Sequence, residues 1–428
     1  MSLSALPLGE KLRLIRKDRG LSLENIAHGT GCSVATLSRL ERGEADVDND
    51  VLTAIRKTLD VENAPLLEEE CTFFESRLWL WNDLLASDRL QEAKEIQQEM
   101  SSVLQLPYIQ NISLLYSLTE ARMIYYDSGN IQLMQEKMEA VDTHYSEMKG
   151  EARCLFYYNK ASLSNSHNNF KEAINHYTTA LECIGDNLKS LAPILLVNLG
   201  ACYGRISRPF HAVLYFERAS QACFGDLTSN LKPTINIQLS VGYRAIGELK
   251  KAKQHTTEAL AHAKRVKYSV GIGVCYCNYA EIGVASGNYE EALGFCDQSL
   301  EQLKDEERQY DLYLNALYLK ACILLELRRF TELSQLAKQG VELSKDFKTY
   351  ALLFESVAHL ATLKNSESED FIESVTIPSL IKKNNTRAIL FYSNKLEEHF
   401  RKKRSNKRAM NLVEISRDIY RSMTMSAD

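Results

Sequence analysis

Small and apolar residues recur along most of the chain at intervals of about 40 residues. The clearest copy has small residues at Gly200, Ala212 and Ala219, with the large residue Phe216 between the last two. Small residues spaced in this way fall where the two helices of a hairpin touch, and large residues fill the gaps beside them. The positions equivalent to Gly200, called anchor positions below, are Trp81, Ala121, Ala161, Ser240, Ala280, Ala321 and Ala361. The pattern predicts an all-α chain built largely from stacked helical hairpins.

Each hairpin is expected to bury two further positions, which lie 12 and 19 residues after its anchor position. In the second copy, after Ala121, these positions are Leu133 and Ala140. The spacing resembles the tetratricopeptide repeat, with linkers that stretch its usual period of about 34 residues. This resemblance implies a right-handed α-solenoid with a concave inner surface. We expect these tetratricopeptide-like repeats at residues 74–365, followed by C-terminal capping helices at residues 366–428.

The first 60 residues break the repeat pattern and predict four short helices instead. Ser22 and Ser33 stand where their side chains can cap the second and third of these helices. Residues 29–31 read as a tight connection between the two, and Gly43 is placed to end the third. The expected helices span residues 8–20, 23–28, 34–42 and 49–59.

Within this segment, Ala27, Gly31 and Leu37 have the spacing of a helix-turn-helix motif. The second helix of that motif needs a small residue where the third crosses it, and the turn needs a glycine that accepts a positive φ. The runs at residues 12–17 and 37–43 resemble the phage-repressor domain of the XRE type. Nearly all of residues 8–60 take part in this resemblance.

The resemblance implies a DNA-binding domain at residues 1–62. Residues 63–73 interrupt both patterns and are expected to be a linker, with the capped start of the next helix as the alternative. It also implies that Arg16 pairs with Glu41 in a structural role, while the third helix enters the major groove. The residues expected to face bases are Val34, Ala35 and Arg39, and those expected to face phosphates are Thr36, Ser38 and Arg42.

The composition is that of a soluble globular protein, with a formal net charge of −5 over 428 residues. Such a charge gives no general attraction to nucleic acid, so DNA binding must come from a local surface. No run of about 18 apolar residues is present, so we expect a cytoplasmic protein that does not bind membranes. The ten cysteines include no CxxC pair, and we expect no metal or cofactor. The sequence also lacks the spacing of a catalytic triad or a phosphate-binding loop, so we expect no enzyme.

A row of carboxamides marks the repeats two residues before the anchor position. The row consists of Asn159, Asn198, Gln238 and Asn278. An amide both donates and accepts hydrogen bonds, so a row along the inner surface can hold the backbone of an extended peptide. The alternative is that these amides cap or cross-link neighbouring helices. Neighbouring inner positions are candidates for specificity, and they are Tyr158, Arg205, Arg244, Glu281 and Tyr318. Each of these is equally consistent with an exposed or inter-repeat residue.

After Ala361 the repeat fades. Residues 364–370 are polar and predict a loop, and residues 401–408 form a basic run that is expected to be a solvated helix face. The apolar residues of the last helix are expected either to cap the solenoid or to form a dimer contact, and they are Leu412, Ile415, Ile419 and Met423.

A repressor-type domain followed by such repeats resembles the RRNPP group of peptide-pheromone receptors. The resemblance implies a cytoplasmic, homodimeric transcription regulator used in quorum sensing. Its partners would be operator DNA and a short linear signalling peptide in the concave groove. One alternative is a regulator whose repeats bind a partner protein. A second alternative is a protein whose repeats act on response-regulator phosphorylation, as those of some members of that group do.

Overall fold

The computed structural model describes residues 8–59, 68–87, 89–103, 110–148, 150–223, 230–306, 309–363, 365–383 and 385–424. Within these ranges every regular element is helical, which confirms the predicted all-α class. The chain divides into two compact units, and each is described separately. The first unit is Met1–Leu163 with Thr179–Leu191, and the second is Ser164–Thr178 with Ala192–Asp428. None of the described helices is long and apolar enough to cross a membrane.

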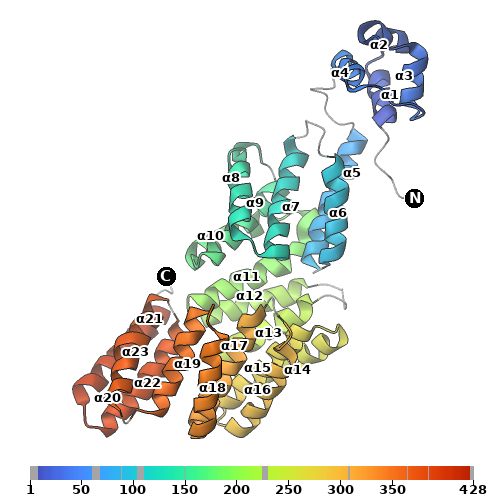
Figure 1. The fold of residues 1–428 in the computed structure, drawn as a ribbon. Helices are drawn as coiled ribbons and strands as arrows, with labels where there is room; N and C mark the ends of the chain where they lie inside the picture. The colour runs from blue at the N-terminus through green and yellow to red at the C-terminus, as the bar shows by residue number, and fades with distance from the viewer. Residues whose placement is uncertain are drawn as a thin grey trace. The chain divides into compact units, whose positions relative to one another are not determined.

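The N-terminal head, in the first unit, contains the four predicted helices (Figure 1). Their buried core is formed by Leu12, Ile26, Leu37, Leu40, Ile55 and Leu59. The helices are α1 (Leu8–Asp18), α2 (Leu23–Thr30), α3 (Val34–Glu41) and α4 (Asn49–Thr58).

The predicted caps of the head are confirmed. The Ser22 hydroxyl accepts a hydrogen bond from the backbone N–H of Asn25 at 3.2 Å, and Ser33 accepts one from Thr36 at 3.1 Å. The predicted end of α2 was two residues short, because Thr30 still belongs to the helix and its hydroxyl donates to the Ile26 carbonyl at 2.9 Å. Gly31 alone makes the turn, with a φ of 68°.

The rest of the first unit consists of hairpin helices. The predicted linker at 63–73 falls partly outside the described residues, and from Glu68 onward it is already helix. From Glu68 the segment therefore follows the alternative expectation, the start of the next helix. The elements are α5 (Glu68–Ala86), α6 (Leu90–Val103), α7 (Gln110–Ser128), α8 (Ile131–Asp142), η1 (Tyr145–Glu147), α9 (Glu151–Ser166) and η2 (Asp186–Leu191).

The second unit continues with paired helices, which Figure 1 shows stacked from α11 to α19. The boundary between the units falls within the α9–α10 hairpin. The elements are α10 (Phe170–Glu182), α11 (Ala192–Arg205), α12 (Pro209–Ala222), α13 (Leu231–Ala245), α14 (Leu249–Arg265), α15 (Ser269–Ala285), α16 (Tyr289–Leu303), α17 (Tyr310–Glu326), α18 (Phe330–Leu343) and α19 (Lys348–Ala361).

The anchor positions lie where the sequence pattern put them, at close contacts between helices. A Cβ atom added at Gly200 would lie 2.6 Å from Cε1 of Phe216 on α12, so only glycine fits there. Ala161, Ala280 and Ala321 are fully buried. Ala361, the last copy, is half-buried.

The second copy departs from the predicted register. Leu133 is 39% exposed and Ala140 is exposed, whereas Met134 and Val141 are buried. Helix α8 begins ten residues after the anchor Ala121, instead of nine as in the neighbouring hairpins, because α7 extends further past its anchor than α5 and α9 do. One additional residue between the anchor and the start of α8 moves the buried positions of α8 one residue along the chain.

The first helix of each hairpin in the second unit lies on the inner side of the stack. Successive first helices, α11, α13, α15, α17 and α19, contact one another directly. Successive second helices, α12, α14, α16 and α18, make no comparable contacts in the described part of the chain. A stack whose helices are closer on one side curves toward that side, so the first helices form the concave layer.

The C-terminal segment closes the second unit with α20 (Ser366–Phe371), a π-helical turn η4 (Ile372–Thr376), α21 (Ile377–Lys382), α22 (Thr386–Lys402) and α23 (Asn406–Thr424). The predicted loop at 364–370 is wrong from Ser366 onward, because Asn365 caps a helix there. Leu412 is buried, and Ile415 and Ile419 pack against the same core, so the last helix caps the solenoid. The side chain of Met423 lies outside the described residues.

The basic run at residues 401–408 pairs with acidic side chains of the C-terminal segment, α20 to α23, which is called the cap below. Lys403 and Arg408 both pair with Glu369, which is only 4% exposed, and the Nε of Arg408 donates to Glu373 at 2.7 Å. Arg401 pairs with Glu397 along α22. The run therefore joins α20, η4, α22 and α23, and only part of it is the solvated face that the sequence predicted.

Candidate DNA-binding and peptide-binding surfaces

Helix α3 presents the residues expected to contact DNA. Val34, Ala35 and Arg39 are exposed along it, while Thr36 is half-buried and its hydroxyl lies 2.8 Å from that of Ser33. Ser38 is also half-buried. The exposed face suits direct base contact, whereas Thr36 and Ser38 are placed at its edge.

Arg42 follows α3 and is exposed. Its Nη2 lies 3.1 Å from Oε2 of Glu44, and both side chains are 53% exposed. An exposed pair of this kind is weak and is screened by salt, so the guanidinium can exchange its partner for a phosphate.

A buried ion pair holds α3 against α1. Arg16 Nε donates to Oε1 of Glu41 at 2.6 Å, and Arg16 Nη2 donates to Oε2 at 2.9 Å. Its third nitrogen donates to the Leu21 carbonyl at 2.9 Å. The Glu41 carboxylate raises the pKa of Arg16 through these bonds. The structural role predicted for this pair is confirmed, because one guanidinium joins α1, the following turn and the end of α3.

The carboxamide row divides between the two units. Asn198 on α11 and Gln238 on α13 are half-buried in the concave layer of the second unit. Asn278 on α15 is 5% exposed, and its Nδ2 makes no hydrogen bond. These three amides share one repeat position on three neighbouring inner helices, as the sequence predicted.

Asn159 and Tyr158, in the first unit, are not on an open surface. Asn159 is fully buried and its Nδ2 donates to the Leu118 carbonyl of α7 at 2.8 Å. Tyr158 is 1% exposed, and its ring lies 5.1 Å from the guanidinium carbon of Arg122. In this conformation both residues connect α7 and α9. Asn159 and Tyr158 were expected to contact a ligand, and this expectation is wrong for the structure described. Both residues instead link neighbouring helices, which was the alternative.

Arg122 is a buried cation that the repeat-based prediction missed. It is fully buried, and its Nη1 donates to the side-chain oxygen of Asn82 at 2.9 Å. It occupies the position just after the anchor Ala121, which corresponds to Glu281 in the sixth copy. Reading that repeat position along the chain would have found it.

Two of the predicted specificity residues meet in the second unit. Arg244 on α13 pairs with Glu281 on α15, and a residue of the cap, Arg387 on α22, pairs with the other oxygen of the same carboxylate. Burial opposes ionisation of Glu281, yet Arg387 and Arg244 together lower its pKa below the usual value. Burial also lowers the pKa of Arg244, and Glu281 opposes that shift.

The remaining predicted residues differ in exposure. Tyr318 on α17 is half-buried, and its hydroxyl donates to that of Tyr392 on α22 at 3.0 Å. Arg205 is exposed at the end of α11. Helix α22 thus reaches the concave layer at α15 and α17, a closure that no repeat pattern could predict.

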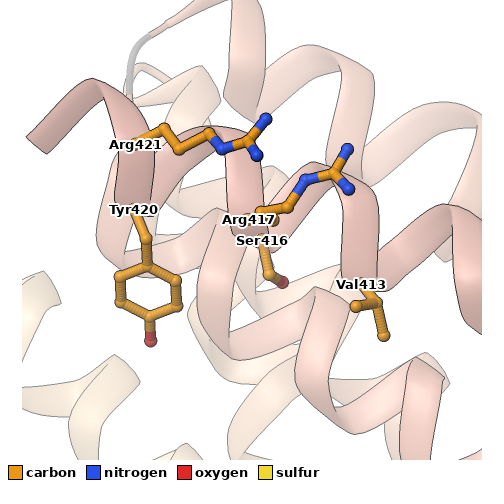
Figure 2. A pocket seen from close by; sticks show the side chains of 5 residues that line it. All are labelled: Val413, Ser416, Arg417, Tyr420 and Arg421. Carbon is orange, nitrogen blue, oxygen red and sulfur yellow. The ribbon is translucent and has the colours of Figure 1, made fainter. Parts of the chain in front are cut away.

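A shallow recess of about 380 Å³ lies on the outer face of α23 (Figure 2). Its lining comes from this one helix and combines two arginines with apolar and hydroxyl side chains, namely Val413, Ser416, Arg417, Tyr420 and Arg421. None of the predicted site residues takes part in it.

Comparison with known proteins agrees with the two-part organisation. Residues 7–69 match the family described as a helix-turn-helix domain. No curated protein sequence matches the chain. A solved Rap protein, complexed with competence and sporulation factor, is 17% identical with a TM-score of 0.70, and the match covers 83% of this chain and 99% of that one.

Two further solved structures share this fold. The apo form of the quorum sensor NprR from B. thuringiensis is 17% identical, with a TM-score of 0.65 over 81% of this chain and 98% of NprR. Aspartyl phosphate phosphatase F from Bacillus subtilis is 14% identical, with a TM-score of 0.56 over 81% and 94%. At such identities the likeness shows the fold alone.

The head and the repeats together define a helix-turn-helix protein with a tetratricopeptide-like repeat domain. In fold, this two-part organisation agrees with the predicted resemblance to the RRNPP group.

Proposed function

We propose that this protein is a sequence-specific DNA-binding transcription regulator, switched by a short linear signalling peptide. The head binds operator DNA through α3, and the peptide lies along the concave layer of the second unit. The protein acts in the cytoplasm as a homodimer, whose two heads bind paired half-sites. The peptide shifts operator binding by its differential affinity for two arrangements of the heads.

The observation that carries the peptide proposal is the amide row in the concave layer. Asn198, Gln238 and Asn278 stand on adjacent inner helices, and Asn278 keeps a buried donor without an acceptor. A buried donor without a partner costs about 1–3 kcal/mol, and a peptide carbonyl would supply the missing acceptor. Structures with the same fold include the Rap protein with competence and sporulation factor and NprR with its cognate peptide NprX.

The experiment has two stages. Operator sites are first selected from random DNA with the full chain, and heptapeptides that change operator affinity are then selected from a random library. Replacing both Asn198 and Asn278 by alanine should abolish the response to the peptide while operator affinity without peptide stays unchanged. Gln254 is the matched control, because it is an exposed amide on the outer helix α14.

The alternative is that the repeats bind a partner protein instead of a free peptide. It predicts that no short peptide changes operator affinity and that the double variant loses binding of a folded partner. We propose no enzymatic activity for this chain, although one protein with this fold is named aspartyl phosphate phosphatase F. Release of phosphate from a phosphorylated response-regulator domain by the purified chain would contradict that part of the proposal.

A further inference from the structure

Three charged side chains from three separate helices meet in the second unit. Arg244 of α13 bonds one oxygen of the Glu281 carboxylate, and Arg387 of α22 bonds the other. Glu281 is 7% exposed and Arg244 is 17% exposed. Two guanidiniums therefore share one carboxylate, and the cluster carries a net charge of about +1 because arginine stays protonated.

One of the two cations is accessible. The Arg387 side chain is 64% exposed, although its Nη1 is bound to Glu281. Its other N–H groups make no hydrogen bond within the described ranges of the chain. A guanidinium carries five donors in a planar fork, so Arg387 can bind a second acceptor without first releasing Glu281.

A second observation comes from the neighbouring turn of α15. Asn278 lies three residues before Glu281, which places the two side chains next to each other on the helix surface. Asn278 is 5% exposed, and its Nδ2 has no hydrogen-bond partner. The Nδ2 donor of Asn278, which lacks an acceptor, therefore lies next on α15 to the carboxylate that holds the two guanidiniums.

We propose that this cluster, Asn278 with Arg244, Glu281 and Arg387, binds a carboxylate of the signalling peptide and that Glu281 holds the two arginines in position. The inference rests on the proposed function and adds the chemistry of the ligand. The carboxylate belongs either to an Asp or Glu side chain or to the peptide's C-terminus. A neutral amide in its place binds more weakly because it forms no charge-assisted hydrogen bond.

The wild-type chain provides the first test. Heptapeptides retained by the full chain from a random library are resynthesised in three forms. The first form keeps its Asp and Glu side chains but has an amidated C-terminus. The second form has Asn or Gln in place of Asp or Glu and keeps a free C-terminal carboxylate. The third form has the Asn or Gln replacements and the amidated C-terminus, so it carries no carboxylate. The form with the recognised carboxylate should bind about tenfold more tightly than the form without any. Whichever of the first two forms retains this advantage identifies the source of the carboxylate.

Variants locate the effect. Arg387→Ala should remove the preference for the carboxylate and leave affinity for the neutral form within about twofold, while Arg387→Lys should keep part of the preference. Arg401→Ala is the matched control, because Arg401 also lies on α22, pairs with one glutamate and is 66% exposed. A full preference in Arg387→Ala would overturn the proposed site.

The outcomes separate the two proposals. If the wild type retains peptides but binds all three forms equally, the carboxylate inference is wrong and the peptide-switched function stands. If the wild type retains no peptide at all, both are wrong. The three peptide forms are compared on the wild-type protein. The carboxylate inference can therefore be refuted even if the Arg387→Ala variant misfolds.

Discussion

Replacing Glu41 with alanine is expected to destabilise the head severely without removing any DNA-facing side chain. The change leaves the Arg16 guanidinium, in a pair whose side chains are 12% and 9% exposed, without its counter-ion. Breaking a buried pair from one side costs about 3–5 kcal/mol, and the slight exposure of this pair favours the lower figure. A cost of about 3 kcal/mol is a large part of the 5–15 kcal/mol that stabilises an ordinary domain.

Hydrogen exchange on the full chain measures this effect where it occurs. A loss of about 3 kcal/mol should speed the exchange of the α3 amides by about a hundredfold, while the amides of α13 in the second unit exchange as before. Operator affinity should fall in parallel, because α3 no longer holds its position against α1.

Glu44→Ala is the matched control for this experiment. Glu44 follows the same helix and pairs with Arg42, but both side chains are 53% exposed, so the change should cost less than about 1 kcal/mol. Equal exchange rates in the Glu41 and Glu44 variants would refute the claim that burial of the Arg16–Glu41 pair stabilises the head.

Four further substitutions test the helix contacts, the charged cluster and the DNA-binding helix. Gly200→Ala should lower the free energy of unfolding by about 1–3 kcal/mol, because its Cβ would meet Phe216 at 2.6 Å. In contrast, Gly204→Ala, whose Cβ would lie 4.0 Å from Ala212, should raise it by up to about 1 kcal/mol in a denaturant titration. The pKa of Glu281 is lower in the folded protein than the value of about 4.3 for an unfolded glutamate. The stability that Glu281 contributes is therefore fully present above about pH 4.3, and it is lost as the pH falls through the lower folded-state pKa. Thermal unfolding should therefore show a smaller acid-induced loss in Glu281→Gln than in the wild type. Arg39→Ala should cost about 1–3 kcal/mol of operator affinity and relax base choice at one position, as measured by gel shift at constant salt.

The repeat pattern predicted those parts of the fold that depend on spacing within one hairpin. Gly200 and Ala280 could be recognised because a helix–helix contact demands a small residue whatever surrounds the hairpin. Ser22 and Ser33 could be recognised for a similar reason, since a cap depends on local backbone geometry. Leu133 was misplaced because α7 runs further past its anchor and places one additional residue before α8, and no residue type marks that difference.

The sites depend on long-range packing and were predicted less completely. Asn159 and Asn198 occupy the same repeat position but differ in their surroundings. Asn159 is buried and donates to the Leu118 carbonyl, whereas Asn198 is half-buried. Arg387 lies 106 residues from Glu281 along the chain and outside the repeats, so no periodicity connects the two. The sequence identified two members of the charged cluster, and the folding back of the cap helix supplies the third.

The most direct test of the central claim is the affinity of the full chain for its selected operator, measured with and without a selected heptapeptide at one salt concentration. If a peptide switches the protein, saturating peptide should change this affinity by about tenfold or more in the wild type and should have no effect when Asn198 and Asn278 are both alanine. An operator affinity that stays the same with every peptide that binds the repeats would contradict the central claim.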